Sequence, residues 1–277
     1  MIKKILIVLS ILGLVGCKTD LTQLNDNGYI NLYNGQDLND WNIMCRDFNK
    51  ELAEKVFTSG ENGVMHVFKD FEDEFGFKEN RNETHCMFFS NKEYSRYSFK
   101  FEYKWGAKRF NNFDTYQYDA GMYYHVFDAK VWPQGLEYQV RYNHLEDLNH
   151  TGDIWNSGAQ FDWYAQEGES STKELSYLSP QEGGVAQKYR GGEHRASKKT
   201  VYNGLNGRWN KCEVIVMGNK YAVHILNDKV VNVLRNLSHS KGVIGLQAET
   251  AEIFYRNIEV KEFNSDIPIE KVLEKYK

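Results

Sequence analysis

The chain contains only three prolines and four cysteines in 277 residues. With so little proline and with 34 tyrosines and phenylalanines, the composition favours β-strands joined by glycine and asparagine turns over a disordered polymer. There is no CxxC pair, which argues against a zinc cluster, and no dinucleotide-binding fingerprint, so a redox cofactor is not expected. The net charge of −4 comes without a basic stripe, and nucleic acid is therefore not expected as a partner.

The N-terminus has the pattern of a bacterial lipoprotein leader. After a positively charged start, Ile5–Val15 is apolar but too short to span a bilayer comfortably, and it leads into Leu-Val-Gly-Cys ending at Cys17. This resembles the lipobox, in which the cysteine is lipidated and becomes the mature N-terminus, so residues 1–17 are predicted to be a signal peptide. Lys18 after the cysteine indicates sorting to the outer membrane. We expect a cell-envelope protein held at the membrane by its lipid anchor only, facing the periplasm or the surface, with 18–28 as a polar tether.

Three cysteines remain after the lipobox, and they are Cys45, Cys86 and Cys212. One disulfide is compatible with an oxidising compartment. The sequence does not choose the pair, and buried free thiols are an equally good interpretation.

Three stretches, Tyr97–Trp105, Tyr118–Phe127 and Leu136–Tyr142, alternate apolar with polar residues and are predicted to be strands. Their polar positions are Ser98, Lys100, Glu102, Lys104, Asp119, Gly121, Tyr123, His125, Glu137, Gln139 and Arg141. If the three strands share a sheet, this surface suits hydrogen bonding to a hydroxyl-rich ligand and acid–base chemistry on it. The alternative is the solvated face of an antiparallel sheet.

The rest of the chain indicates one further run of strands. They are predicted over 207–216, 221–227, 230–234, 243–248 and 252–260. All-β segments at this spacing predict an all-β, two-sheet jelly-roll sandwich, formed by a single domain over 29–263 with a charged C-terminal tail at 264–277. Within it, 143–192 is a long polar segment, and its part 157–192 is an insertion of unassigned role.

Eight short motifs follow one another along the chain. They are Tyr33-Asn-Gly-Gln-Asp-Leu-Asn-Asp-Trp41, Asp119-Ala-Gly-Met122, Glu137-Tyr-Gln139, Thr151-Gly152, Gly207-Arg-Trp-Asn210, Asn227-Asp228, Gly242-Val-Ile-Gly-Leu-Gln247 and Arg256-Asn-Ile258. In order and number they resemble the 3-keto-disaccharide hydrolase domain family, also described as 3-keto-glucoside 1,2-lyase/hydratase domains and common among Bacteroidetes lipoproteins. The resemblance covers roughly 28–263 and implies a concanavalin/laminin-G-like jelly roll.

The resemblance also implies an activity, the cleavage of 3-keto-glycosides by elimination across C1–C2 followed by hydration, which is net hydrolysis. A C3 ketone acidifies the C2 hydrogen, so the reaction needs a base near C2, a cation or metal at the enolate oxygen and an acid at the leaving oxygen. No cofactor is required with certainty, although a divalent metal ion is compatible with the enolate role. The substrate is a glycoside or oligosaccharide, and a separate dehydrogenase would oxidise C3.

Residues were assigned to these roles from the pattern and the resemblance together. Glu137 or His224 is the candidate base, and Glu249, His224 or a histidine of the long loop is the candidate acid. Lys104 or Arg141 is the candidate cation. Many members of the family have Asp/Ser-His-Gly where this chain has Ala248-Glu249-Thr250, so Glu249 must replace that histidine or the role lies elsewhere. The candidate sugar-binding residues are Gln139, Arg141, Asp119, Tyr123, Trp155, Gln247, Arg256 and His125.

Each assignment has a structural alternative. The charged residues could form cross-strand ion pairs, the aromatic residues could pack in the core, and His224 could be a buried histidine with satisfied hydrogen bonds. Two other functions also fit the sequence. One is a conventional glycosidase in which Glu137 pairs with Glu102 or Glu249, and the other is a non-catalytic glycan-binding jelly roll.

Overall fold

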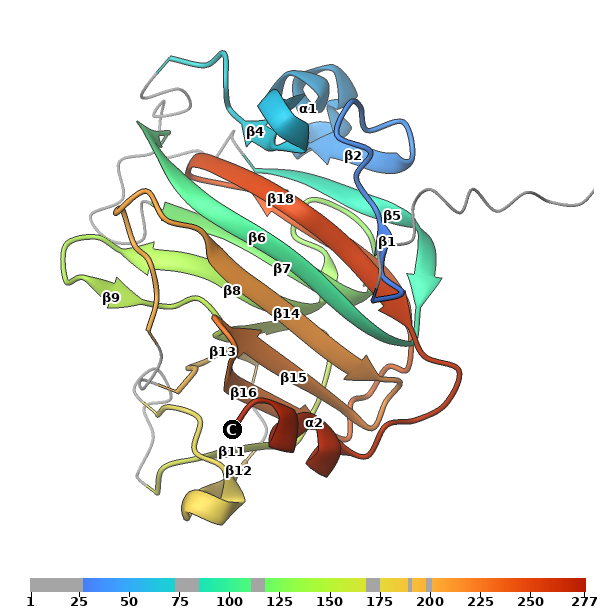
Figure 1. Cartoon of the computed structure of the whole chain (residues 1–277), viewed down its shortest axis with the longest axis vertical. Coiled ribbons are helices and arrows are strands. Elements are labelled where there is room, and N and C mark those ends of the chain that lie inside the picture. Colours follow the sequence, from blue (N-terminus) through green and yellow to red (C-terminus); the bar gives the residue numbers. More distant parts are fainter. Residues whose placement is uncertain (1–26, 73–84, 111–117, 168–174, 189–190, 198–200) are drawn as a thin grey trace, which may run out of the picture.

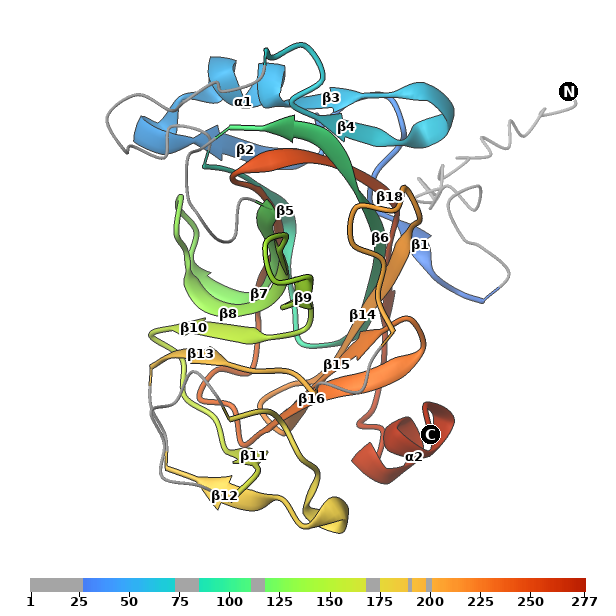
Figure 2. The same cartoon turned by 90° about the vertical axis from the view of Figure 1, so that its left-hand side faces the viewer.

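A computed structural model describes residues 27–72, 85–110, 118–167, 175–188, 191–197 and 201–277. In this part of the chain two large antiparallel sheets pack face to face, as Figures 1 and 2 show from two sides. The predicted all-β, two-sheet sandwich is therefore confirmed. The predicted signal peptide, Cys17 and most of the tether lie outside the described residues.

The first sheet, called sheet A, faces the viewer in Figure 1. In sheet order its strands are β16 (Lys229–Arg235), β15 (Tyr221–Leu226), β14 (Asn210–Met217), β6 (Arg96–Arg109), β18 (Ala251–Glu262), β4 (Met65–Val67) and β3 (Phe57–Ser59), with β1 (Ile30–Asn31) paired to β18. The second, sheet B, lies behind it. Its strands are β13 (Gly192–His194), β10 (Ile154–Ser157), β8 (Gln134–Asn143), β7 (Tyr118–Asp128), β17 (Gly242–Ala248), β5 (Cys86–Tyr94) and β2 (Trp41–Cys45), with β9 (Leu148–Asn149) paired to β8.

The three alternating stretches are strands as predicted, but they do not share a sheet. β7 and β8 are neighbours in sheet B, whereas β6 lies in sheet A between β14 and β18. The polar side of β6 therefore faces away from sheet B, on the opposite surface of the molecule. The prediction of one common polar surface is wrong for β6 and holds for the other two strands.

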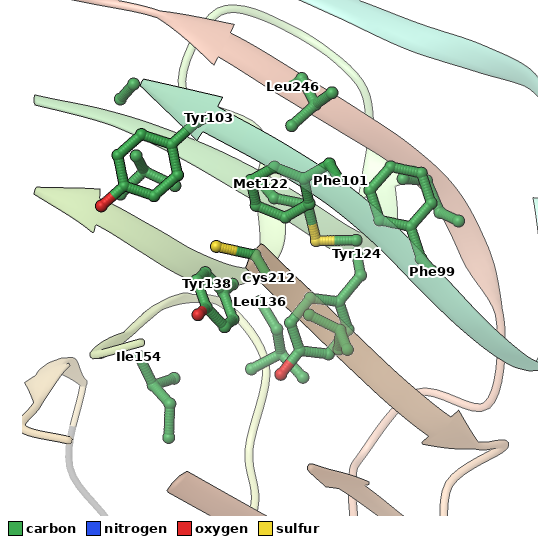
Figure 3. Close-up of a cluster of buried hydrophobic side chains, with 14 of the residues drawn as sticks. Phe99, Phe101, Tyr103, Met122, Tyr124, Leu136, Tyr138, Ile154, Cys212 and Leu246 are labelled. Atoms are coloured by element: carbon green, nitrogen blue, oxygen red, sulfur yellow. The ribbon is translucent and has the colours of Figure 1, made fainter. Parts of the chain in front are cut away.

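The core between the sheets is built from the apolar sides of these alternating strands. Figure 3 shows Phe99, Phe101 and Tyr103 of β6 facing Met122 and Tyr124 of β7. All five are 1% exposed or less, so the inter-sheet layer is closed to solvent. Burial of large aromatic side chains supplies most of the driving force for packing the two sheets together.

The described part of the chain also contains two α-helices and a disulfide. The disulfide joins Cys45 and Cys86 on the adjacent strands β2 and β5, and Cys212 is buried and free. Helix α1 (Lys50–Val56) begins at Asn49, whose side chain accepts a hydrogen bond from the Leu52 amide, and it is followed directly by β3. The short 3₁₀ turns are η2 (Arg46–Phe48), η3 (Glu61–Gly63) and η5 (Pro180–Glu182).

The segments predicted as a tail and as an insertion both carry secondary structure. In the former, α2 (Ile269–Lys275) docks on sheet A with Ile269 and Val272 buried. In the latter, β11 (Trp163–Ala165) and β12 (Val185–Gln187) form a small separate sheet, seen at the bottom of Figure 2. Among the described residues, no helix is both long enough and apolar enough to cross a membrane.

Candidate active site on the outer face of sheet B

The polar sides of β7 and β8 lie on the face of sheet B that points away from sheet A. Strand register places their residues in rows across the sheet. Glu137 is opposite Tyr123 on one side and Trp155 on the other. Gln139 is opposite Gly121, and the next pair along is Arg141 and Asp119. The sequence pattern thus brings acids, amides and an arginine together on one surface.

Glu137 lies over the gap left by Gly121. A Cβ atom at position 121 would approach the Oε1 of Glu137 to 2.0 Å, so only glycine leaves room for this carboxyl group. Glu137 is 3% exposed, and burial raises its pKa to about 8. The Tyr123 hydroxyl and the Arg141 charge act in the opposite direction, while the Glu249 carboxylate adds to the increase.

Two more carboxyl groups complete an acidic cluster around Glu137. Burial, reinforced by the charges of Glu249 and Glu137, raises the pKa of Asp119 well above its usual range. Arg141 lies 3.7 Å from Asp119 and opposes that increase. On the other side His85 contacts Glu249, with Nε2 to Oε1 at 2.6 Å. An ionised carboxyl group in this cluster therefore disfavours the ionisation of Asp119 and Glu137 beside it.

Two amide side chains on the same face have unused acceptors. Gln139 is 5% exposed and Gln247, from β17, is 1% exposed. Within the described residues, the Oε1 atom of each has no hydrogen-bond partner. A buried polar atom without a partner is costly, and it becomes satisfied when a ligand supplies a hydroxyl donor.

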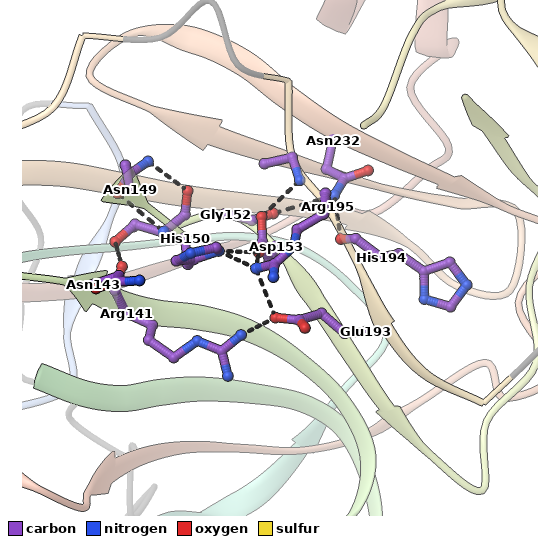
Figure 4. A network of polar contacts seen from close by, with 12 residues as sticks. Arg141, Asn143, Asn149, His150, Gly152, Asp153, Glu193, His194, Arg195 and Asn232 are labelled. Carbon is purple, nitrogen blue, oxygen red and sulfur yellow. Dashed lines mark hydrogen bonds and ion pairs between the residues drawn. The ribbon is translucent and has the colours of Figure 1, made fainter. Parts of the chain in front are cut away.

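A network of ion pairs forms the edge of this face toward β10 and β13, as Figure 4 shows. Glu193 contacts both Arg141 and Arg195, the latter at 3.0 Å. Arg195 also lies 2.8 Å from Asp153, and it contacts His150. Although burial acts to raise the pKa of Asp153, the hydrogen bond from His150 and the charge of Arg195 hold it below its usual value.

The same network contains a donor set that could hold a metal ion. In the described part of the chain, His150, Asp153 and Glu193 each offer one ligand atom, and these atoms lie within 4.8 Å of one another. One nitrogen of Arg195, Nη1, contacts all three of these side chains. The guanidinium is therefore the cation at this point, and a metal ion would have to displace it.

A second boundary of the face is the loop between β7 and β8. Val131 in this loop packs against an apolar cluster on the outer face of sheet B, formed by Met44, Met87, Phe89, Tyr123 and Val126. Trp132 follows, with φ of 58° and its ring 4.5 Å from both the His85 ring and the Arg46 guanidinium carbon. Because His85 binds Glu249, this loop is in contact with the acidic cluster.

Two predicted site residues belong to the opposite surface. Lys104 lies on the outer face of sheet A, where its ammonium is 4.9 Å from the ring centre of Phe254. Arg256 binds Glu102 at 2.7 Å and stacks 4.0 Å over Trp209. Neither can contact a ligand that is bound at Glu137, so both assignments are wrong for this site.

Two predicted histidines are structural. His224 is fully buried between the sheets, with 2.8 Å to the Tyr124 hydroxyl and 3.0 Å to the Gly152 carbonyl. His125 has φ of 49° at an irregularity of β7, and its ring turns inward to the Gly218 carbonyl at 2.9 Å. Burial lowers the pKa of each to about 4, so both imidazoles are neutral and out of reach of a ligand.

Seven predicted residues are brought together, namely Glu137, Gln139, Arg141, Asp119, Tyr123, Gln247 and Glu249, and Trp155 lies beside them with 42% of its surface exposed. The prediction did not include His85, Glu193 and Asp153. Their contacts are made across strands, and a local signal for them is the His194-Arg195 pair just after the long polar segment.

Comparison with known proteins identifies the family. A family described as the 3-keto-alpha-glucoside-1,2-lyase-like domain matches residues 28–261. The chain belongs to this family. A carbohydrate-related function is therefore supported, and the acidic cluster over Gly121 is the candidate active site of this 3-keto-alpha-glucoside-1,2-lyase-like domain. None of the curated proteins matches the chain.

Several solved structures resemble this lyase-like domain at low sequence identity. A proposed glycosyl hydrolase from Parabacteroides distasonis is 16% identical with a TM-score of 0.49, covering 86% of this chain and 95% of that one. A Bacillus subtilis protein with a galectin-like fold is 12% identical with a TM-score of 0.41, covering 84% and 94%. A legume lectin-like domain from Entamoeba histolytica is 7% identical with a TM-score of 0.41, covering 82% and 91%.

Proposed function

We propose that this protein cleaves 3-keto-glucosides by elimination across C1–C2 followed by addition of water. The observation that supports this most is the combination of Glu137, whose pKa is raised to about 8, with a second carboxyl group and a guanidinium beside it. Elimination next to a ketone needs a strong base, an acid and a cation close together. The unused oxygens of Gln139 and Gln247 are suited to accepting sugar hydroxyl donors.

Each group has a role that follows from its charge state. Glu137 is the base, because a carboxylate with a pKa near 8 is far more basic than an ordinary one. Asp119 is the acid, since burial and the neighbouring charge of Glu249 raise its pKa well above its usual range and so favour its protonated form. Arg141 carries a permanent positive charge next to both and is the candidate partner of the enolate oxygen.

The reaction then proceeds with balanced proton transfers. Glu137 removes the C2 proton and the electrons move to the C3 oxygen, which Arg141 stabilises as an enolate. The C1–oxygen bond breaks as Asp119 protonates the leaving aglycone, which leaves an unsaturated 3-keto sugar. Water then adds to C1, leaving its hydroxyl there and giving one proton to Asp119, while Glu137 returns a solvent-exchanged proton to C2, and the product is the free 3-keto sugar.

The pH dependence tests the role of Glu137. Only its deprotonated form is a base, so kcat/KM is expected to rise about tenfold per pH unit up to a plateau above pH ~8. The Tyr123 hydroxyl lowers the pKa of Glu137, so in Tyr123→Phe this ascending limb should move to higher pH. The apparent pKa belongs to the whole carboxyl cluster. A profile that falls between pH 6 and 8 would instead make Glu137 the acid.

The activity itself is tested with a matched pair of substrates in buffered D₂O, the 3-keto-glucoside and the unoxidised glucoside, each with and without a chelator. We expect aglycone release from the 3-keto form only, with deuterium at C2 of the released sugar. Loss of activity with the chelator would assign a metal role to His150, Asp153 and Glu193.

The same experiment separates the alternatives. Release from the unoxidised glucoside without deuterium would identify a conventional two-carboxylate glycosidase. Binding of both sugars without any release would identify a glycan-binding domain. We further propose that the protein acts in the cell envelope, anchored through Cys17, and that a separate dehydrogenase supplies its oxidised substrate.

A further inference from the structure

A second site lies on the opposite surface, between sheet A and helix α2. A cavity of about 450 Å³ opens there, with walls from β6, β14, β18 and α2. Its apolar part includes Ile215 and Val272, each 5% exposed. This cavity is on the far side of the sandwich from Glu137 and is independent of the proposed catalytic chemistry (Figure 1).

Four lysines line this cavity, namely Lys100, Lys261, Lys271 and Lys275. In the described part of the chain, none of them has a carboxylate oxygen within 4.0 Å. Other lysines of the surface do, since Lys92 pairs with Glu262, Lys220 with Asp266 and Lys241 with Glu93. Four ammonium groups without ion pairs around one cavity form a concentrated positive site.

Aromatic contacts hold two of these ammonium groups close together. The Lys100 ammonium is 4.1 Å from the ring centre of Tyr29, and that of Lys261 is 5.8 Å from the same ring. Lys261 also donates a hydrogen bond to the Asn27 carbonyl at 2.8 Å. The pair is thus placed by the fold at the cavity wall, next to the point where the described chain begins.

One carboxylate, that of Glu213, lines the same cavity, and neighbouring hydroxyl groups donate hydrogen bonds to it. Glu213 is 7% exposed and accepts hydrogen bonds from Ser98 and Tyr276, both at 2.5 Å, and from Tyr29 at 3.4 Å. Its charge is stabilised by these donors and by the nearby ammonium of Lys100. The lysines therefore outnumber the acids by four to one in this cavity, so an anion is attracted.

A neighbouring cavity of about 420 Å³ has a different balance of positive and negative side chains. It shares Lys100, Lys275 and Glu213 with the first, and it adds one lysine, Lys211, together with three acids, Glu102, Asp228 and Glu259. Four carboxylates against three ammonium groups make that cavity less favourable for an anion than the first. The anion site is consequently confined to the first cavity, where apolar surface adjoins the ammonium groups.

We propose that the first cavity binds the phosphate headgroup of an anionic membrane lipid, with the lysines on the phosphate and the apolar part against the upper acyl chain. Asn27 lines the cavity, and Cys17, the predicted acylation site, is ten residues before it in the sequence. A chain of that length spans at most about 35 Å. The lipid anchor and this cavity can therefore contact one membrane, which orients sheet A toward the lipid and leaves the outer face of sheet B accessible.

The test is a ³¹P NMR titration of the full chain carrying Cys17→Ser, which removes acylation. The ligands are dihexanoyl phosphatidylglycerol, dihexanoyl phosphatidylcholine and inorganic phosphate, each below its micelle concentration where that applies. We expect the phosphatidylglycerol to bind at least about tenfold more tightly than phosphatidylcholine, because its headgroup has a net negative charge, and than inorganic phosphate, because only the lipid has an acyl chain for the apolar wall. Equal binding of inorganic phosphate would overturn the lipid assignment.

Lysine variants test whether the phosphatidylglycerol binds at this cavity. Lys100→Gln, Lys261→Gln and Lys271→Gln together should remove the preference for phosphatidylglycerol, while the corresponding three arginine substitutions should keep it. The control, Lys55→Gln with Lys92→Gln and Lys241→Gln, makes the same change in net charge at lysines that already have ion pairs. A preference that survives in the first variant, or is lost equally in the control, would contradict a site at this cavity.

Discussion

Replacing Glu137 by glutamine is expected to lower kcat on a 3-keto-glucoside by about 10²–10⁴-fold, because the amide cannot accept the C2 proton. The fold should survive the change. Glutamine has nearly the same shape, it fits the space over Gly121, and the carboxyl that it replaces is 3% exposed and largely protonated at pH 7. Steady-state kinetics and a melting curve of the same preparation measure both expectations.

A matched control is available in β6, the strand with the same alternating pattern on the opposite surface of the molecule. Lys104→Gln likewise replaces an ionisable side chain by an amide, but on the outer face of sheet A, where the ammonium lies 5.2 Å from the ring centre of Trp209 and 4.9 Å from that of Phe254. Its kcat/KM should equal that of the wild type. Full activity in Glu137→Gln, or an equal loss in Lys104→Gln, would place the chemistry elsewhere.

Removing the disulfide by Cys45→Ala with Cys86→Ala is expected to lower the free energy of unfolding by about 4 kcal/mol in the chain-entropy view. The bond closes a loop of 41 residues between strands that are direct neighbours in sheet B. A loop of this length gives the unfolded chain much freedom when it is opened. Urea denaturation of the oxidised wild type and of the double variant measures the difference.

The free thiol provides the control for that experiment. Cys212 is buried and unpaired, so Cys212→Ala removes a sulfur atom without opening a loop and should lower the free energy of unfolding by only about 1 kcal/mol. A double variant as stable as Cys212→Ala would show that the cross-link contributes nothing beyond packing.

The disulfide also lies next to the candidate active site, since Cys45 precedes Arg46 and Cys86 follows His85.

Alternation along the sequence was sufficient to predict which side of each strand is polar. It worked for β7 and β8, where Asp119, Glu137, Gln139 and Arg141 share one face. Alternation does not determine which strands are neighbours, because each strand with one apolar side can face the core from either sheet. For that reason the polar side of β6, including Lys104, was assigned to the wrong surface.

Local irregularities of the strands and contacts between side chains on different strands could not be predicted from the sequence. The positive φ of His125 turns that ring inward, although strict alternation places it on the same face of the strand as Asp119. His85 precedes its strand and meets Glu249 only because β5 and β17 are paired. The network of Glu193, Arg195 and Asp153 likewise depends on β13 joining β10 at the sheet edge.

The acid positions, by contrast, follow from the motifs. Glu137-Tyr-Gln139 and Asp119-Ala-Gly121 are sequence motifs that the fold places side by side, with the glycine of one leaving space for the acid of the other. Glu249, which stands where many members of the family have histidine, also lies within the cluster. The charge of Glu249 raises the pKa of both Asp119 and Glu137. A histidine at that position would exert no such effect when neutral.

A crystal structure of the Glu137→Gln variant with a bound 3-keto-glucoside would examine the proposed site without relying on rates. We predict the sugar ring on the outer face of sheet B, with C2 next to residue 137, the C3 oxygen toward Arg141, and hydroxyl groups donating to Gln139 and Gln247. A sugar bound on sheet A, or one that contacts none of these four side chains, would contradict the assignment of the active site.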